Sequence, residues 1–84
     1  MKTAIVIPKL SQTMEEATIT EILVSDGDFV KAGQIVINIS ADKADAAIAP
    51  EKDGYIQIVC AVEDEIEVGK PIAYIADNME ELGL

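Results

Sequence analysis

The feature that most constrains this chain is that its sequence repeats itself at an offset of 36 residues. Residues 18–39, TITEILVSDGDFVKAGQIVINI, align with residues 54–75, GYIQIVCAVEDEIEVGKPIAYI, so that Ile22 meets Ile58, Asp28 meets Asp64 and Gly33 meets Gly69. Two copies are too few for a solenoid, which needs at least three stacked units. The repeat therefore predicts one domain with internal two-fold symmetry, in which each half covers the apolar face of the other.

Both copies alternate with a period of two, the pattern of strands with one wet face. The side chains expected to share a face are Thr20, Ile22 and Val24; Ile35, Ile37 and Ile39; Ile56, Ile58 and Cys60; and Ile72 with Tyr74. The chain has only three aromatic residues. We therefore expect a core of β-branched aliphatic side chains, which suit a pleated, half-buried surface.

The strands are predicted to be short and separated by glycine-containing turns. They are expected near residues 3–7, 18–24, 29–30, 35–40, 45–49, 54–60, 65–66 and 71–76. Asp-Gly, Ala-Gly and Gly-Lys-Pro steps between them favour an all-β sandwich or barrel. Residues 1–77 are predicted to form the domain. Residues 78–84, NMEELGL, are predicted to form a tail or the start of an interdomain linker, and could be helical.

Charge and composition exclude several classes of function. The 84 residues include 16 acidic residues, 6 lysines and no histidine, for a net charge of −10. Such a surface repels phosphate backbones and anionic membranes, so no nucleic-acid or membrane partner is expected, whereas a basic protein partner is favoured. Without histidine or a cysteine pair, no zinc site is expected. The apolar run in the opening segment, MKTAIVIPKL, is too short for a signal peptide or a membrane span, so we expect a cytoplasmic protein.

One lysine stands out at residues 40–46, SADKADA. Lys43 lies between Asp42 and Asp45, in the short connection between two predicted strands, and the surrounding alanines leave nothing bulky to cover its amine. We expect a tight hairpin with Asp42 near the start of a type I turn. The neighbouring carboxylates favour the charged ammonium. The plainer interpretation is a solvated turn residue, as for the surface charges Lys2, Lys9, Lys31, Lys52 and Lys70.

Several motifs in order resemble the lipoyl domains of 2-oxo-acid dehydrogenase complexes. The motif at the hairpin is DKA, and IPKLSQTMEEATI (residues 7–19) resembles the family's Pro-x-Leu-Ser-x-Thr-Met opening. SDGDFVKAGQIVINI (25–39) resembles its Gly-Asp-x-Val-x-x-Gly-x-x-Leu strand entry, and APEKDGYI (49–56) its Pro-x-x-x-Gly return strand. The resemblance spans about residues 3–76. It implies a flattened β-barrel (a barrel-sandwich hybrid) of two antiparallel sheets with quasi-two-fold symmetry.

The resemblance also implies a carrier function and its partners. Lys43 would bear lipoic acid in amide linkage, as a swinging arm attached by a lipoate ligase or lipoyl transferase. The arm would serve a thiamine-diphosphate decarboxylase, an acyltransferase core and the flavin-containing dihydrolipoamide dehydrogenase. The domain itself would not be an enzyme, would have no catalytic residue, and is expected to be monomeric when isolated. It would belong to a dihydrolipoamide acyltransferase of a pyruvate- or acetoin-type complex, in the cytoplasm or, in a eukaryote, the mitochondrial matrix.

The resemblance assigns further roles around the hairpin. Asp42 and Ala44 are candidate recognition residues for the ligase or a partner, with Asp45 a weaker one. Residues 9–16 are a candidate contact for the decarboxylase. Ser40 and Ala41 depart from the family, which commonly has Glu-Thr at these positions.

Two other classes of function remain open. A biotin carboxyl carrier domain shares the fold, but its lysine usually lies between two methionines. An unmodified barrel-sandwich adaptor, as in the membrane-fusion proteins of efflux pumps, typically lacks the exposed hairpin lysine. The glycine-cleavage carrier protein is longer and has additional helices. Among the remaining residues, Cys60 is expected in the core, and Met14 is expected to pack near the loop that precedes the strand at 18–24.

Overall fold

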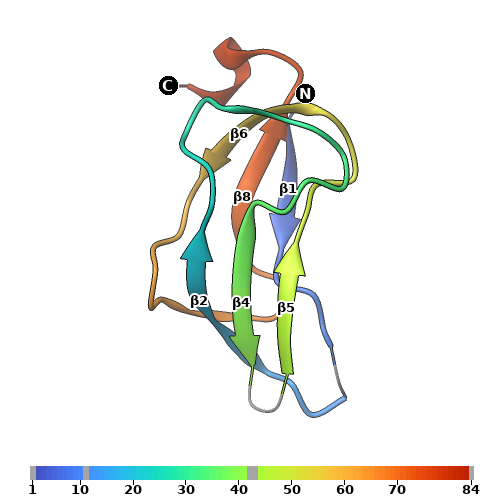
Figure 1. Ribbon diagram of the computed structural model, residues 1–84, viewed down its shortest axis with the longest axis vertical. Coiled ribbons are helices and arrows are strands. Elements are labelled where there is room, and N and C mark those ends of the chain that lie inside the picture. The colour runs from blue at the N-terminus through green and yellow to red at the C-terminus, as the bar shows by residue number, and fades with distance from the viewer. Residues whose placement is uncertain (1, 11, 42–43, 84) are drawn as a thin grey trace.

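All eight expected strands form in the computed structural model, which describes residues 2–10, 12–41 and 44–83. They are β1 (Lys2–Val6), β2 (Glu16–Ile22), β3 (Phe29–Val30), β4 (Ile37–Ala41), β5 (Ala44–Ile48), β6 (Gly54–Ile58), β7 (Glu65–Glu67) and β8 (Pro71–Ala76). A short 3₁₀ helix, η1 (Met79–Leu82), follows β8. The strands lie in an elongated, flattened barrel-sandwich (Figure 1).

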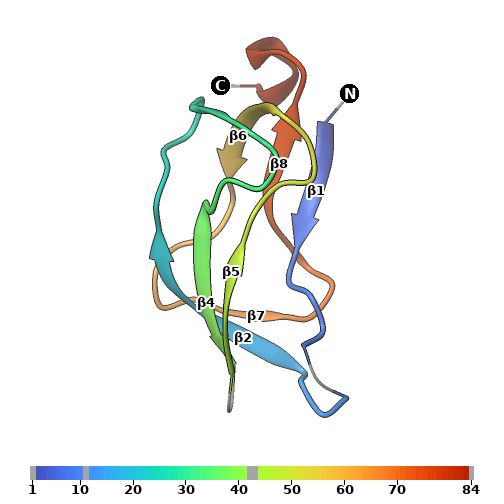
Figure 2. The ribbon, with the colours of Figure 1, turned by 45° about the vertical axis from the view of Figure 1, so that its right-hand side comes forward.

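The strands form two antiparallel sheets of four strands each, ordered β1-β8-β6-β3 and β5-β4-β2-β7. We call these sheet A and sheet B. The predicted two-fold symmetry exchanges them: β2, β3 and β4 of the first copy correspond to β6, β7 and β8 of the second, and β5 corresponds to β1. The short strands β3 and β7 each pair with the other copy. The halves are therefore interlocked, and the sheets remain unclosed along the β1 and β5 edges (Figure 2).

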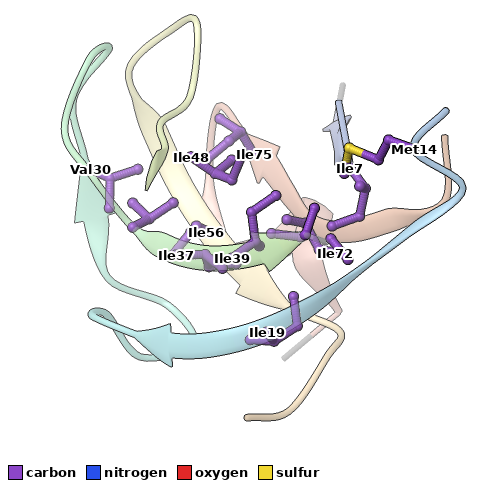
Figure 3. Close-up of a cluster of buried hydrophobic side chains, with 14 residues drawn as sticks. Ile7, Met14, Ile19, Val30, Ile37, Ile39, Ile48, Ile56, Ile72 and Ile75 are labelled. Carbon is purple, nitrogen blue, oxygen red and sulfur yellow. The ribbon is translucent and has the colours of Figure 1, made fainter. Parts of the chain in front are cut away.

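The core consists of aliphatic side chains from both sheets, as predicted from the scarcity of aromatics. Ile19, Ile37 and Ile56 are among the residues with no exposed surface, and they meet between the sheets (Figure 3). Met14 is 7% exposed and belongs to the same cluster, while Cys60 is partly buried against it. The prediction for Met14 is confirmed, whereas Cys60 lies at the edge of the core and not within it as predicted. Each fully buried side chain of this size contributes about 1.5–3 kcal/mol relative to an exposed one.

Simple alternation fails in β2 because the strand contains a bulge. Ile19 pairs with Ile39 and Glu21 pairs with Asn38, so Thr20 is an extra residue on this strand. Its hydroxyl donates a hydrogen bond to the Asn38 carbonyl at 3.0 Å, and its side chain is exposed. The prediction that Thr20 shares a face with Ile22 and Val24 was therefore wrong, and Ile19 occupies the core.

Two other predicted faces also need correction. Ile35 is 42% exposed and Val36 is fully buried, because β4 begins only at Ile37. Ile72 and Tyr74 do not share a face: Tyr74 pairs with half-buried Gln57, whereas Ile72 is fully buried beside a register irregularity at the β1–β8 pairing.

The start of β1, the end of β8 and η1 lie at one end of the molecule, and the β4–β5 hairpin points to the other (Figure 1). Asn78 caps η1 by accepting a hydrogen bond from the Glu81 N–H at 3.1 Å. Leu82 is 2% exposed, so η1 packs on the barrel rather than trailing from it. In the part of the chain that the structure describes, no helix is long and apolar enough to cross a membrane.

Candidate functional site

The hairpin of β4 and β5 carries the lysine identified in the sequence. The two strands pair in an unbroken register from Ile37 with Ile48 to Ala41 with Ala44. Only Asp42 and Lys43 separate the last pair, so the expected two-residue connection is confirmed in length. Both residues lie outside the described residues, and the predictions of the turn type and of their roles remain predictions.

The residues on either side of this connection have small side chains. Ala41 is 7% exposed and faces the core, while Ala44 begins β5 and is exposed. Asp45 is exposed and pairs with Ser40 on the outer face of sheet B. Ala44 and Asp45 are therefore accessible to a partner, as their candidate recognition roles require.

The outer face of sheet B is polar and acidic near the hairpin. Glu16 and Glu67 are direct cross-strand neighbours, and Thr18 lies opposite Glu65. Like charges directly opposite one another destabilise a sheet, so packing does not account for this arrangement. The four strands of sheet B contain no lysine. This face fits the basic partner that the net charge favours.

The loop between β1 and β2 borders the base of the hairpin. Thr13, Met14 and Glu15 line one hollow together with Ser40 and Ala41. Met14 anchors the loop, since its sulfur accepts a hydrogen bond from the Leu10 N–H at 3.3 Å. The structure thus brings part of the 9–16 segment next to the hairpin, and contact with a decarboxylase remains a prediction.

A second hollow lies on the outer face of sheet B, and sequence reasoning missed it. Thr20, Asn38, Ser40, Asp45 and Ala47 line it, together with Ile39 and Ala46. The predicted pairing of residues 35–40 with residues 45–49 contained the signal, because it placed the short side chains of Ser40 and Ala47 on the outer face of the hairpin. Ser40, one of the two residues that replace the family's common Glu-Thr pair, is part of this hollow.

Acidic side chains and one thiol are the described groups that could bind a metal or act as a nucleophile. No group of three or more histidine, cysteine or acidic side chains is placed to hold a metal among the residues that the structure describes. Burial, with a smaller contribution from Asp64, raises the pKa of the Cys60 thiol and keeps it protonated. Cys60 therefore lacks the thiolate character of a nucleophile.

Comparisons with known proteins agree with the motifs. The biotin/lipoyl family model, described as "Biotin-requiring enzyme", matches residues 3–75. The chain is 33% identical over 73 residues to a dihydrolipoyllysine-residue succinyltransferase component of the 2-oxoglutarate dehydrogenase complex from Staphylococcus saprophyticus, covering 86% of this chain and 17% of the relative. It is 37% identical over 84 residues to a dihydrolipoyllysine-residue acetyltransferase component of the pyruvate dehydrogenase complex from Zymomonas mobilis, covering 98% and 19%.

A third relative has a different function. The pyruvate dehydrogenase E1 component subunit beta from Rhizobium meliloti is 33% identical over 82 residues, covering 95% of this chain and 18% of the relative. The chain therefore spans less than a fifth of the length of each of these three relatives.

Proposed function

The chain belongs to the biotin/lipoyl attachment family, and from this premise we propose that it is a lipoyl carrier domain whose prosthetic group is attached to Lys43. The relatives named dihydrolipoyllysine-residue acyltransferases support lipoate over biotin. The residues beside the lysine, Asp42 and Ala44, also differ from the paired methionines typical of biotin carriers.

The observation that carries the proposal is the placement of the hairpin. A two-residue connection between paired strands holds the one lysine with a lipoyl-type motif. The hairpin points away from the end where β1 starts and β8 ends (Figure 1). An arm attached there would extend from a rigid support, remote from both ends of the described chain.

The chain's own residues would present the arm and leave the chemistry to other proteins. When attached, lipoate supplies a dithiolane that accepts and releases acyl groups and electrons. The small, exposed side chain of Ala44 would leave room for an attaching enzyme beside the connection. Because a lysine amine is ordinarily protonated at neutral pH, that enzyme has to remove the proton before the amide can form.

The partners follow from the same proposal. A lipoate ligase or lipoyl transferase would modify Lys43, with Asp42 and Ala44 as recognition residues. A thiamine-diphosphate decarboxylase, an acyltransferase core and a dihydrolipoamide dehydrogenase would then use the arm. We place the domain in a pyruvate- or acetoin-type complex, in the cytoplasm or mitochondrial matrix, as a monomer when isolated. Relatives from both pyruvate and 2-oxoglutarate complexes match, so the 2-oxo acid has to be determined by assay.

Intact mass spectrometry tests the attachment. The domain is co-expressed with a lipoate ligase in one culture and with a biotin ligase in another. We expect a lipoyl adduct in the first culture, none after Lys43→Ala, and an unchanged adduct after Lys52→Ala. Lys52 is a matched control because it is a surface lysine paired with Asp77 at 3.8 Å, away from the hairpin. A biotin adduct alone, or no adduct in either culture, contradicts the proposal.

A further inference from the structure

We propose that the outer face of sheet A binds an arginine side chain from a positively charged segment of a partner protein, on the ring pair formed by Phe29 and Tyr55. This site goes beyond the proposed function, because it involves no residue of the hairpin and no prosthetic group. The partner has to supply the guanidinium group, since this chain contains lysine but no arginine. A guanidinium group stacks on aromatic rings and pairs with carboxylates, and the site offers both.

The three aromatic side chains of the protein all lie on the outer face of sheet A. Tyr55 pairs with Phe29 on β3 and with Ala76 on β8, and Tyr74 lies two residues before Ala76. Cross-strand partners share a face of a sheet, as do residues two apart on one strand. Ile56, which follows Tyr55, has no exposed surface and points into the core from the opposite face. The core therefore does not account for the gathering of the rings.

The ring pair is accessible, and the same face already holds a cation. Phe29 is 53% exposed, and its ring meets that of Tyr55 edge-on, with centroids 5.3 Å apart and an interplanar angle of 75°. On the same face, the Lys2 amine nitrogen lies 4.9 Å from the centre of the Tyr74 ring. Aromatic rings attract cations through the negative charge on their faces. An exposed ring pair is therefore suited to a cation from another molecule.

Two carboxylates are fixed along the β3 edge of the sheet, on either side of the ring pair. Asp26 accepts a hydrogen bond from the Ile58 N–H at 2.6 Å, and Asp53 accepts one from the Ala32 N–H at 2.8 Å. Along both strands, the ring pair lies between these two contacts. Charges that are already fixed reduce the entropy cost of binding a partner.

The chemistry of this site favours arginine over lysine, and sheet A over sheet B. The two segments that contain the rings, residues 25–31 and 51–55, have four acidic residues and two lysines, so their net charge is negative. The strands of sheet B carry acidic residues but no aromatic ring, so arginine and lysine would gain similar attraction there. On a ring pair, guanidinium has the advantage, because it is planar and more weakly hydrated than an ammonium group.

The site lies away from the hairpin. Tyr55 pairs with Ala76, the last residue of β8, and the end of β8 lies opposite the β4–β5 hairpin along the molecule (Figure 1). A partner that binds the ring pair would therefore leave the hairpin accessible to a second protein. The surface would hold a partner beside the domain while the hairpin is in use.

Nuclear magnetic resonance of the isotope-labelled domain tests the site with two blocked peptides, acetyl-Gly-Arg-Gly-Arg-Gly-amide and its counterpart with lysine in place of arginine. The titrations are made at low salt, because screening weakens both interactions. We expect the arginine peptide to bind several-fold more tightly, to shift the amides of Phe29 and Tyr55, and to show nuclear Overhauser effects between its arginine side-chain protons and the Phe29 ring.

Variants separate the ring contact from general attraction to an acidic protein. Phe29→Ala should weaken binding of the arginine peptide about two- to five-fold, the effect of one exposed cation–ring contact, and should remove the preference over lysine. Leu23→Ala is the matched control, because it shortens an apolar side chain that is 47% exposed outside sheet A. Leu23→Ala and Lys43→Ala should both retain the preference.

The outcomes decide the inference without bearing on the carrier function. Equal affinities of the two peptides, or shift changes confined to the strands of sheet B, overturn the site. Retention of the arginine preference in Phe29→Ala also overturns it. The spectrum of each unbound variant establishes that the fold is retained. Tyr55→Leu, which keeps an apolar side chain but removes the second ring, decides the question if Phe29→Ala does not fold.

Discussion

Glu63 has a backbone conformation that favours glycine, and replacing it with glycine should stabilise the protein. Its φ angle is 77°, the only positive value among the described residues other than glycine. The position equivalent to Glu63 in the first repeat is Gly27, with a φ angle of 87°. Both residues donate their N–H to an isoleucine carbonyl of the other half at 2.7 Å, Glu63 to Ile19 and Gly27 to Ile56. The interlocking of the halves thus holds Glu63 in this conformation.

The expected gain follows from two opposing effects on the backbone. The left-handed region costs an L-residue about 1–2 kcal/mol relative to the right-handed one. Glycine elsewhere costs about 0.5–1 kcal/mol relative to alanine, because it loses more conformational freedom on folding. Glu63→Gly should therefore be more stable than Glu63→Ala by about 0.5–1 kcal/mol. In a domain of this size that difference corresponds to roughly 2–8 °C in Tm.

Urea unfolding of the two variants measures this difference, and comparing glycine with alanine removes the effect of losing the carboxylate. Gly33→Ala is the control for the backbone cost, since φ is 83° there and an added Cβ would meet nothing within 4 Å. It should lose about as much stability as Glu63→Gly gains over Glu63→Ala. If Glu63→Ala is the more stable of the pair, the proposed strain at this position is absent and the reasoning fails.

Four further predictions concern packing, titration and reactivity. Gly54→Ala should cost about 1–3 kcal/mol in urea unfolding, because the new Cβ would lie 2.6 Å from the backbone oxygen of Ala76 on β8; a cost equal to that of an open glycine position contradicts this. Leu82→Ala should lower the free energy of unfolding by about 2–4 kcal/mol, because this side chain is buried, and Met79→Ala by less than about 1 kcal/mol, because this side chain is 46% exposed. Equally small losses in both variants would mean that residues 78–84 form a tail, as the sequence predicts. Burial raises the pKa of the Cys60 thiol, so the stability that the protonated thiol contributes is present below the ordinary thiol pKa and is lost as pH rises through the raised pKa. The free energy of unfolding measured in that alkaline range should therefore decline in the wild type and not in Cys60→Val. In the free domain, Lys43 should react with a soft acylating reagent more slowly than the surface lysines, as read by peptide mass mapping, and an equal or faster rate would refute the effect of its neighbouring carboxylates.

The repeat made most of the fold predictable, because equivalent residues perform the same local task twice. Asp28 accepts a hydrogen bond from the Ser25 N–H at 2.8 Å, and Asp64 accepts one from the Ala61 N–H at 2.9 Å. Each carboxylate closes the turn that leads into a short crossing strand. A motif that specifies a turn in one half therefore specifies it in the other, and the strand boundaries follow.

The sequence was less informative where the structure depends on more than the repeat. The bulge at Thr20 has no counterpart in β6, where Ile56 and Ile58 keep simple alternation, so a pattern of period two could not reveal it. The burial of Leu82 depends on contacts of η1 with the barrel, which local sequence does not encode. The hollow at Ser40 needed the cross-strand register, because its lining comes from three strands.

The symmetry also explains why a scaffold of this kind suits a carrier. Exchanging the halves maps β4 onto β8 and β5 onto β1, so the hairpin that contains Lys43 corresponds to the place where β8 ends and β1 begins. One end of the molecule therefore presents the tight connection between β4 and β5, and the opposite end presents the end of β8 and the start of β1 (Figure 1). A group attached at the hairpin is consequently as remote from those ends as the long axis allows. The distance between a group on the proposed attachment residue and those strand ends therefore follows from the repeat itself. Insertion of residues after Ile48 should leave this distance unchanged, whereas insertion between Ala41 and Ala44 should change it.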